Sequence, residues 1–344
     1  MSNSTPLFSV CIPTFNRRTM LMSAIASALG QSYSNIEVIV SDNASDDGTQ
    51  EAVAAISDSR IRYSRNSTNI GPGGNWQKAI QLAQGYYCSW LQDDDLIVRD
   101  FVSQAVDALE QTNATCCFGA CFQTGTPQCM SNATVFTTAA SLDWALGTPK
   151  TIPPSLALPL AVFESSGIPP AMAYSTAWIQ EHVTQFVHTA FPLYAERLPT
   201  VWAAMTGGLV VIPRLAGIYR SHAAQYSVTM LADDRAAEEQ FKYFLVTLDA
   251  LWQPVNIGLE EFRELLKELP DDVVTKFFLQ VQRRSYGIPF FQSLRTLVEQ
   301  EYRARYPPQL VGAAWRFIGD MTPPIVCRAL DKPLQRLKQS LGVR

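Results

Sequence analysis

The stretch Cys88-Ser-Trp-Leu-Gln-Asp-Asp-Asp-Leu-Ile97 combines the end of an apolar run with three consecutive carboxylates. Residues 86–91 are typical of a buried strand, and Asp93, Asp94 and Asp95 follow it directly. Adjacent carboxylates repel one another, and a bound divalent cation relieves that repulsion. Because Mg²⁺ and Mn²⁺ prefer oxygen ligands and commonly carry substrate phosphates, the stretch indicates a metal and diphosphate site. The alternative is a solvated acidic turn that opens the next helix.

Strand-like and helix-like segments alternate through the first 110 residues, which predicts a parallel sheet covered by helices. Ligands of such sheets bind beyond the carboxyl ends of the strands, and three of these ends are polar here. They are residues 13–17, 41–48 and 92–95. The expected strands are 7–12, 36–40, 60–63 and 86–91, and the expected helices are 18–30, 49–56, 76–83 and 100–110.

The second part of the chain is less regular, and its character changes near residue 229. Strands are expected at 115–128, 171–175 and 209–212, with helices at 176–187 and 196–205. Beyond residue 233 the pattern is helical, with the last clear amphipathic stretch at 289–304. We therefore expect an α/β domain over residues 1–229, with a mostly parallel central sheet, and a helical C-terminal region over residues 230–344.

Composition excludes several classes of protein. With 47% hydrophobic and 17% charged residues the chain is an ordinary globular one, and a net charge of −4 gives no basic field for nucleic acid. Seven cysteines, an odd number without repeated C-x-x-C pairs, suit reduced thiols in a cytoplasmic protein. We expect no signal peptide, and no run approaches the roughly 20 apolar residues that span a bilayer.

Four motifs, in this order and spacing, resemble the family 2 glycosyltransferases, which have the GT-A fold. They are Phe8-Ser-Val-Cys-Ile-Pro-Thr-Phe-Asn16, Val40-Ser-Asp-Asn-Ala-Ser-Asp-Asp-Gly-Thr49, Asn69-Ile-Gly71 with Asn75, and Gln92-Asp-Asp-Asp95. The resemblance covers residues 7–100, with a weaker match at 195–222. It implies inverting transfer of a sugar from a nucleotide diphosphate donor to an acceptor hydroxyl, as in bacterial surface polysaccharide synthesis. It also implies a nucleotide-binding half over 1–115 and an acceptor-binding half over 116–229.

The resemblance assigns the nucleotide to residues on the first loops. Pro13, Thr14 and Phe15 would hold the nucleoside, and the Asp42 carboxylate would accept a hydrogen bond from a base imino group. An Asx-type turn or a helix cap is the alternative for Asp42, although Asp47 fits a cap better. Further residues on the nucleotide side are Arg65, for which a surface arginine is the alternative, Asn75 and Asp93.

The metal motif departs from the family pattern Asp-x-Asp-Asp, because Gln92 stands at its first position. By resemblance Asp94 would contact Mn²⁺ or Mg²⁺, and Asp95 would be the second metal residue. The departure puts the role of Asp93 in doubt, since it falls at the variable position of the motif.

The second half of the chain supplies the remaining candidates. The family's catalytic base is an acid at the start of a helix, which in this register is Glu196, with Glu181 and Glu164 in reserve. Arg220 and His222 match a Tyr-Arg-x-His element that implies contact with the diphosphate and the metal. An ordinary first-turn glutamate and a structural histidine are the alternatives.

Two questions stay open at this level. Apolar residues and cations line the end of the chain between Val326 and Leu341, which suits an anionic membrane surface at the inner face of the cell membrane, the chain's own domain, or a second subunit. The acceptor would be a saccharide or a lipid-linked saccharide. A catalytically impaired sugar-nucleotide-binding or scaffold protein is the alternative function. A sugar-phosphate nucleotidyltransferase is disfavoured, because no Gly-rich phosphate loop follows the first strand.

Overall fold

The computed structural model divides into two compact units, Met1–Leu265 and Leu266–Arg344. In the second unit the described helix is α14 (Pro289–Arg305), which confirms the helix expected at 289–304. The boundary expected near residue 229 lies outside the described residues and stays a prediction. The structure describes residues 5–124, 134–136, 150–151, 170–186, 198–206, 208–220, 222, 263–264, 266–267, 271, 274 and 289–306.

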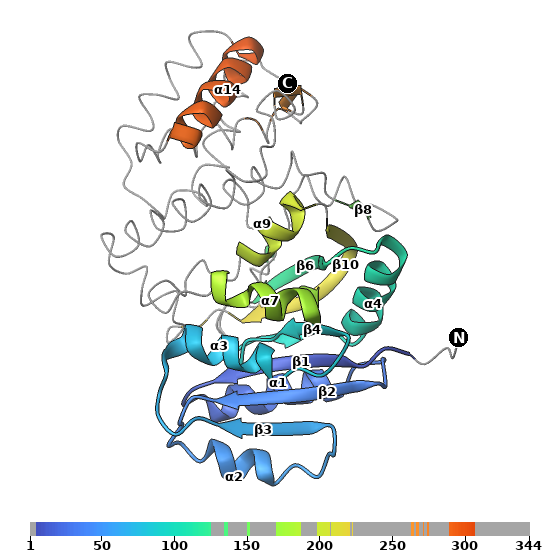
Figure 1. The fold of residues 1–344 in the computed structure, drawn as a ribbon, viewed down its shortest axis with the longest axis vertical. Coiled ribbons are helices and arrows are strands. Elements are labelled where there is room, and N and C mark those ends of the chain that lie inside the picture. Colours follow the sequence, from blue (N-terminus) through green and yellow to red (C-terminus); the bar gives the residue numbers. More distant parts are fainter. Residues whose placement is uncertain are drawn as a thin grey trace. The chain divides into compact units, whose positions relative to one another are not determined.

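The first unit is built on one mixed sheet, whose described strands follow the order β3-β2-β1-β4-β9-β6-β10-β5 (Figure 1). Along this order six strands run in one direction, and β9 and β5 run oppositely. Two short strands lie off it, with β7 beside β6 and β8 beside β10. The strands are β1 (Phe8–Thr14), β2 (Ile36–Asp42), β3 (Ile61–Arg65), β4 (Tyr87–Trp90), β5 (Leu96–Ile97), β6 (Cys116–Thr124), β7 (Thr134–Phe136), β8 (Lys150–Thr151), β9 (Met172–Ser175) and β10 (Leu209–Arg220).

Helices cover both faces of the sheet, which explains why every residue of β1 and β2 is buried. On one face Phe8, Val10 and Ile12 of β1 belong to the same core as α1 and α4. On the other, the rings of Trp76, from α3, and Trp90, from β4, lie 5.6 Å apart. The described helices of this unit are α1 (Arg18–Leu29), α2 (Thr49–Ala54), α3 (Gly71–Gln81), α4 (Phe101–Thr112), α7 (Thr176–Phe186) and α9 (Leu198–Met205).

Strand pairing brings the polar loops together at one edge. Thr14, the last residue of β1, lies opposite Asp42, the last residue of β2. The Leu91 amide donates to the Cys11 carbonyl, so β4 delivers its acids beside β1. Because β5 pairs antiparallel with the end of β10, Ile218 lies opposite Leu96 and Arg220 approaches the acid triplet.

Within the described residues of the first unit, the expected strands and helices are present, and the short strands β5, β7 and β8 are additional. Three further differences stand out. The helix α3 begins at Gly71, within the Gly-Pro-Gly-Gly segment expected to be a loop, because proline fits the first turn of a helix. The strand β10 is continuous from Leu209 to Arg220, with irregular pairing to β6 near Leu215. The strand β9 lies antiparallel between β4 and β6. The described cysteines, which include Cys11 and Cys88, are free and buried.

Gly85 allows the chain entering β4 to approach β1. A Cβ at this position would lie 2.6 Å from the Leu7 carbonyl oxygen and 2.8 Å from the Ser9 nitrogen, and main-chain atoms cannot rotate away. We expect Gly85→Ala to lower the free energy of unfolding by about 1–3 kcal/mol, measured by urea denaturation. In the control Gly74→Ala the nearest atom is a side-chain carbon of Ile70 at 3.3 Å, and we expect a change within about 1 kcal/mol. Equal effects of the two variants would contradict the steric argument.

Glu37 is a buried residue near the amino end of β2. It accepts hydrogen bonds from the Ser9 hydroxyl at 2.6 Å, the Arg62 guanidinium at 2.6 Å and the Gln84 amide at 2.7 Å. Although burial raises the pKa of this carboxyl, its hydrogen bonds to Ser9, Arg62 and Gln84 lower it overall.

A lowered pKa makes this contribution to stability depend on pH. The ionised form is stabilised in the folded protein, so the contribution is present above the ordinary glutamate value of 4.5 and is lost as pH falls through the lower folded value. We expect Glu37→Gln to cost about 1–3 kcal/mol in urea denaturation at pH 7 and less at pH 3.5. A cost independent of pH would show that ionisation of Glu37 does not matter.

Candidate active site

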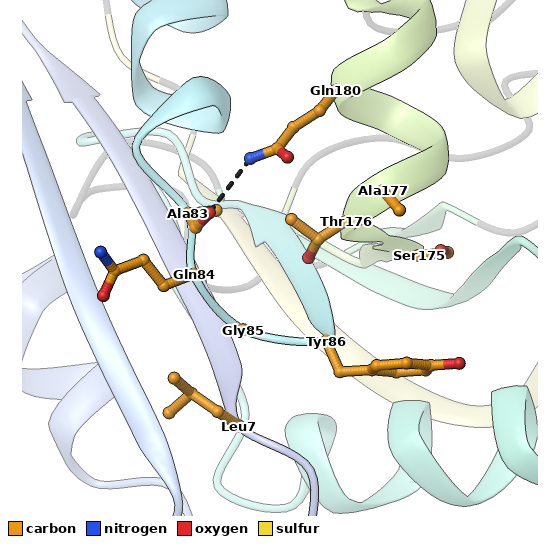
Figure 2. Close-up of a pocket in the computed structure, with 9 residues that line it drawn as sticks. All are labelled: Leu7, Ala83, Gln84, Gly85, Tyr86, Ser175, Thr176, Ala177 and Gln180. Atoms are coloured by element: carbon orange, nitrogen blue, oxygen red, sulfur yellow. Dashed lines mark hydrogen bonds between the residues drawn. The ribbon is translucent and has the colours of Figure 1, made fainter.

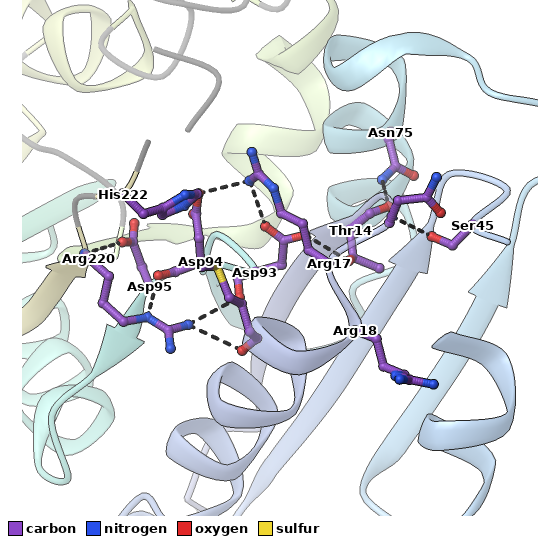
Figure 3. A network of polar contacts seen from close by, with 12 residues as sticks. Thr14, Arg17, Arg18, Ser45, Asn75, Asp93, Asp94, Asp95, Arg220 and His222 are labelled. Atoms are coloured by element: carbon purple, nitrogen blue, oxygen red, sulfur yellow. Dashed lines mark hydrogen bonds and ion pairs between the residues drawn. The ribbon is translucent and has the colours of Figure 1, made fainter. Parts of the chain in front are cut away.

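The acid triplet lies at the carboxyl edge of the sheet, almost excluded from water (Figure 3). Asp93 and Asp94 are each 4% exposed, and Asp95 is fully buried. The Thr14 hydroxyl donates to Asp93 Oδ2 at 2.7 Å, which joins the ends of β1 and β4. The triplet therefore belongs to the protein interior, and its alternative interpretation as a solvated acidic turn is wrong.

Arg17 lies across two of these acids, although the sequence motifs assigned no role to it. One guanidinium nitrogen is 3.1 Å from Asp93 Oδ1 and 2.8 Å from Asp94 Oδ2. Its position on the loop after β1, beside the end of β4, is the signal that identifies it. A cation on that loop has to lie near acids that follow the neighbouring parallel strand.

Residues from the end of β10 complete the cluster. His222 Nε2 lies 3.1 Å from Asp94 Oδ2, and the Arg220 amide donates to Asp95 Oδ1 at 2.9 Å. The Arg220 guanidinium donates to the main-chain carbonyls of Asp94, Asp93 and Met20. In this structure Arg220 therefore fixes the backbone of the triplet, and its role at a diphosphate stays a prediction.

The charge balance of the triplet is incomplete. Burial and the neighbouring Asp94 raise the pKa of Asp93 to about 6, against the effect of Arg17 and Thr14. The same two causes raise the pKa of Asp95 well above its ordinary value. Among the described residues, Asp95 Oδ2 and His222 Nδ1 are buried and have no hydrogen-bond partner. An additional cation would stabilise the ionised carboxylates and reduce their mutual repulsion.

The donor set fits a metal ion that shares its ligands with a substrate. Among the described residues, no three His, Cys, Asp or Glu side chains surround a common point. Asp94 Oδ2 and His222 Nε2 do lie side by side, and Mg²⁺ is commonly held by one or two protein ligands together with substrate phosphates. Asp94, Asp95 and His222 would hold the ion together with a diphosphate, and this assignment stays a prediction.

Asp42 lies beside this cluster, on the nucleoside side predicted from the sequence. Its carboxylate is fully buried and accepts hydrogen bonds from the Ser45 amide at 2.9 Å and from the Tyr63 hydroxyl. Arg65 Nε lies 3.8 Å from Asp42 Oδ2, so these two predicted residues do meet. The bond to Ser45 is the Asx-type turn considered above. Each carboxylate oxygen can accept two hydrogen bonds, so Asp42 could still accept one from a nucleotide base. That contact stays a prediction.

Asn75 links the two groups of predicted residues. Its side-chain amide donates to the carbonyls of Ser41 at 2.8 Å and Thr14 at 3.4 Å, and its oxygen accepts from Ser41 and Asn66. Lys78 Nζ donates to Asn66 Oδ1 at 2.6 Å. Asn75 is 2% exposed, so in this structure it braces the ends of β1 and β2 from inside.

The loops after β1 and β2 hold each other in unusual conformations. Asn16 and Ala44 have φ values of 53° and 69°, and such values are uncommon for residues other than glycine. The Asn16 amide donates to the Ser45 hydroxyl at 2.9 Å, and Asn16 Oδ1 accepts from the Asp46 amide. Strained backbone of this kind is typical of functional sites. Pro13 is buried, whereas Phe15 next to it is 43% exposed and free to meet a ligand.

The predicted base is not placed by the structure. Glu196 and the reserve candidate Glu164 lie outside the described residues. Glu181 is exposed on α7 and has no described contact with the acid triplet. The cationic stripe at the end of the chain also lies outside the described residues. Within the described part of the chain, no helix is long and apolar enough to cross a membrane.

A cavity of about 510 Å³ lies at the opposite ends of β1 and β4 (Figure 2). Its lining carries no charged side chain, and Tyr86, Gln84 and Gln180 are its largest polar residues. A site for a nucleotide diphosphate needs cations or a metal ion, so the acid triplet remains the candidate. The lining residues are Leu7, Ala83, Gln84, Gly85, Tyr86, Ser175, Thr176, Ala177 and Gln180.

Comparison with known proteins finds matches for the first part of the chain. Residues 9–140 match the model of the family described as Glycosyl transferase family 2. The chain is 40% identical over 99 residues to the abequosyltransferase RfbV of Salmonella typhimurium, which covers 27% of this chain and 30% of the relative. It is 38% identical over 101 residues to a GalNAc(5)-diNAcBac-PP-undecaprenol beta-1,3-glucosyltransferase of Campylobacter jejuni, which covers 28% and 33%. The chain thus matches only about a third of the length of these two relatives.

Solved structures show the same fold. S. aureus TarS, residues 1–349, was solved in complex with UDP and in complex with UDP-GlcNAc. The UDP complex superposes with a TM-score of 0.50 at 16% identity, over 86% of this chain and 89% of TarS. The mixed sheet with its covering helices therefore has the GT-A fold. Residues 9–140 of this chain form a glycosyl transferase family 2 domain.

Proposed function

We propose that this protein is an inverting glycosyltransferase that moves a sugar from a nucleotide diphosphate donor to an acceptor hydroxyl, with Mn²⁺ or Mg²⁺ as cofactor. The observation that carries the proposal is the buried acid triplet at the carboxyl edge of the sheet, where Asp95 Oδ2 has no hydrogen-bond partner among the described residues. The family match of residues 9–140 supports the same reaction.

Each part of the site has a separate task in this proposal. Phe15, Asp42 and Arg65 bind the nucleoside, and Asp94 with His222 lies where the diphosphate meets its cation. When bound, the metal neutralises charge that develops on the leaving diphosphate. A carboxylate removes the proton of the acceptor hydroxyl, and Glu196 is the candidate from the sequence.

The acceptor is proposed to be a saccharide or a lipid-linked saccharide of a cell-surface polymer. The names of two relatives, from Campylobacter jejuni and Escherichia coli, describe transfer to undecaprenol-linked sugars. A chain that serves such an acceptor would work in the cytoplasm, in peripheral contact with the inner face of the membrane. The cationic stripe near the end of the chain supports this location, and a homo-oligomer would use the same stripe.

Two observations favour a second function. Gln92 replaces the first acid of the metal motif, and the described residues contain no three-ligand metal group. A protein that binds sugar nucleotides without transferring the sugar would tolerate both features. Nucleotide binding without donor hydrolysis or transfer would support this alternative.

The first test of this proposal concerns nucleotide binding. In calorimetric titrations of UDP, GDP, dTDP and CDP, we expect one nucleotide to bind preferentially and to need Mn²⁺ for full affinity. Asp94→Asn should lower the affinity measured with Mn²⁺ by about tenfold or more, because charge-assisted ligands are lost. The affinity measured without metal should change little.

The matched control is Asp107→Asn, which removes an exposed carboxylate from α4 and should leave all four titrations unchanged. If no nucleotide bound to the wild-type protein with or without Mn²⁺, the transferase proposal would be wrong.

The second prediction separates the two roles of Asp42. If Asp42 accepts from a base, Asp42→Asn should weaken nucleotide binding by about tenfold and leave Mn²⁺ affinity unchanged. Tyr63→Phe removes only the tyrosine hydroxyl that donates to the same carboxylate and should weaken the nucleotide less. Unchanged nucleotide affinity in Asp42→Asn would show that Asp42 serves the turn alone.

A further inference from the structure

Arg17 forms the outer layer of the acid triplet. Its side chain is 26% exposed, whereas the side chains of Asp93 and Asp94, which it contacts, are only 5% and 6% exposed. The guanidinium lies between Asp93 and the side of the site that carries His222 (Figure 3). A ligand that approaches these carboxylates from solvent therefore meets a positive charge first.

Arg17 and a metal ion compete for the same oxygen. Asp94 Oδ2 has an Arg17 nitrogen at 2.8 Å and His222 Nε2 at 3.1 Å. Manganese and magnesium ions bind carboxylate oxygens at about 2.0–2.2 Å. A divalent ion there would lie within about 3–4 Å of a guanidinium, and like charges at that distance repel strongly. Metal binding at Asp94 Oδ2 would therefore require Arg17 to move.

The displaced guanidinium has a suitable destination in the proposed function. A nucleotide diphosphate brings negative charge to the same edge of the sheet, and the planar guanidinium matches phosphate oxygens with two parallel hydrogen bonds. Arg17 lies on the loop between Thr14 and α1, and its long side chain is partly exposed to solvent.

We propose that Arg17 is a resident counter-cation that occupies the carboxylate site in the absence of donor and moves to the donor diphosphate when the metal binds. The inference rests on the proposed function for its second half only. Under this proposal the metal and the diphosphate bind cooperatively. The diphosphate draws Arg17 away from the carboxylates, and the metal frees Arg17 to bind the diphosphate. Arg17 is thus a positioning residue for the donor.

The competing explanation is that Arg17 forms a fixed, structural ion pair. The two explanations predict opposite changes in metal affinity when Arg17 is removed. If Arg17 only stabilises the folded triplet, its removal should weaken the binding of every ligand or leave it unchanged. If Arg17 competes with the metal, its removal should strengthen metal binding in the absence of donor. By thermodynamic reciprocity the same variant should lose part of the coupling between metal and diphosphate.

The experiment titrates the whole chain with Mn²⁺ alone, followed by electron paramagnetic resonance of free Mn²⁺. We expect Arg17→Gln to bind Mn²⁺ about tenfold more tightly than wild type. At saturating Mn²⁺ the same variant should bind inorganic pyrophosphate about tenfold more weakly. Arg17→Lys, which keeps the charge, should stay close to wild type in the first titration.

Arg18→Gln is the matched control, because Arg18 is the next residue, is exposed, and directs its side chain away from the triplet (Figure 3). It should leave both titrations unchanged. Thermal unfolding of each variant confirms that it is folded.

Two outcomes would overturn the inference. Unchanged or weaker Mn²⁺ binding in Arg17→Gln would show a structural ion pair. Tighter Mn²⁺ binding with unchanged pyrophosphate binding would show that Arg17 does not reach the diphosphate. Tighter Mn²⁺ binding in a protein that binds none of the four nucleotides would support the competition and reject the transferase proposal.

Discussion

The cost of burying three adjacent carboxylates governs the architecture around them. An ionised group leaves water only when partners replace its hydration, so Asp93, Asp94 and Asp95 need donors from elsewhere in the chain. These donors come from the end of β1, the loop after it, and the end of β10. The sheet order is what brings these three points together. The site is therefore also a junction between the first four strands and the later ones.

A second buried carboxylate shows what a purely structural solution looks like. Glu37 has three donors and a lowered pKa. Asp93 and Asp95 have raised pKa values, and one Asp95 oxygen has no partner in the described part of the chain. Glu37 lies near the amino end of β2, whereas Asp93 and Asp95 follow the carboxyl end of β4, so the two groups lie at opposite edges of the sheet. Perturbed ionisable groups concentrate at functional sites, so the difference supports the proposal that a ligand binds at the edge with Asp95.

Local pattern predicted the parts of this protein that depend on local physics. The strands and helices of residues 7–112 follow from apolar periodicity, and the meeting of Thr14, Asp42 and Asp93 follows from parallel pairing. The start of α3 at Gly71 was missed, because glycine suppresses helix propensity while proline in the first turn restores it. Arg17 was missed since an ion pair over 76 residues leaves no periodic signal. The antiparallel insertion of β9 likewise depends on pairing far along the chain.

The antiparallel pairing of β5 with β10 has a consequence for the order in which the nascent chain becomes competent. The Asp95 carboxylate and the Arg220 amide that donates to it are separated by 125 residues. At about 5–20 residues per second, a ribosome needs roughly 6–25 s to synthesise that interval. During it, the first four strands can emerge and pair while the triplet still lacks its late partner. A chain truncated before residue 220 would keep the loops after β1 and β2 but lack the Arg220 contacts to the acid triplet, so translation itself delays assembly of the complete cluster.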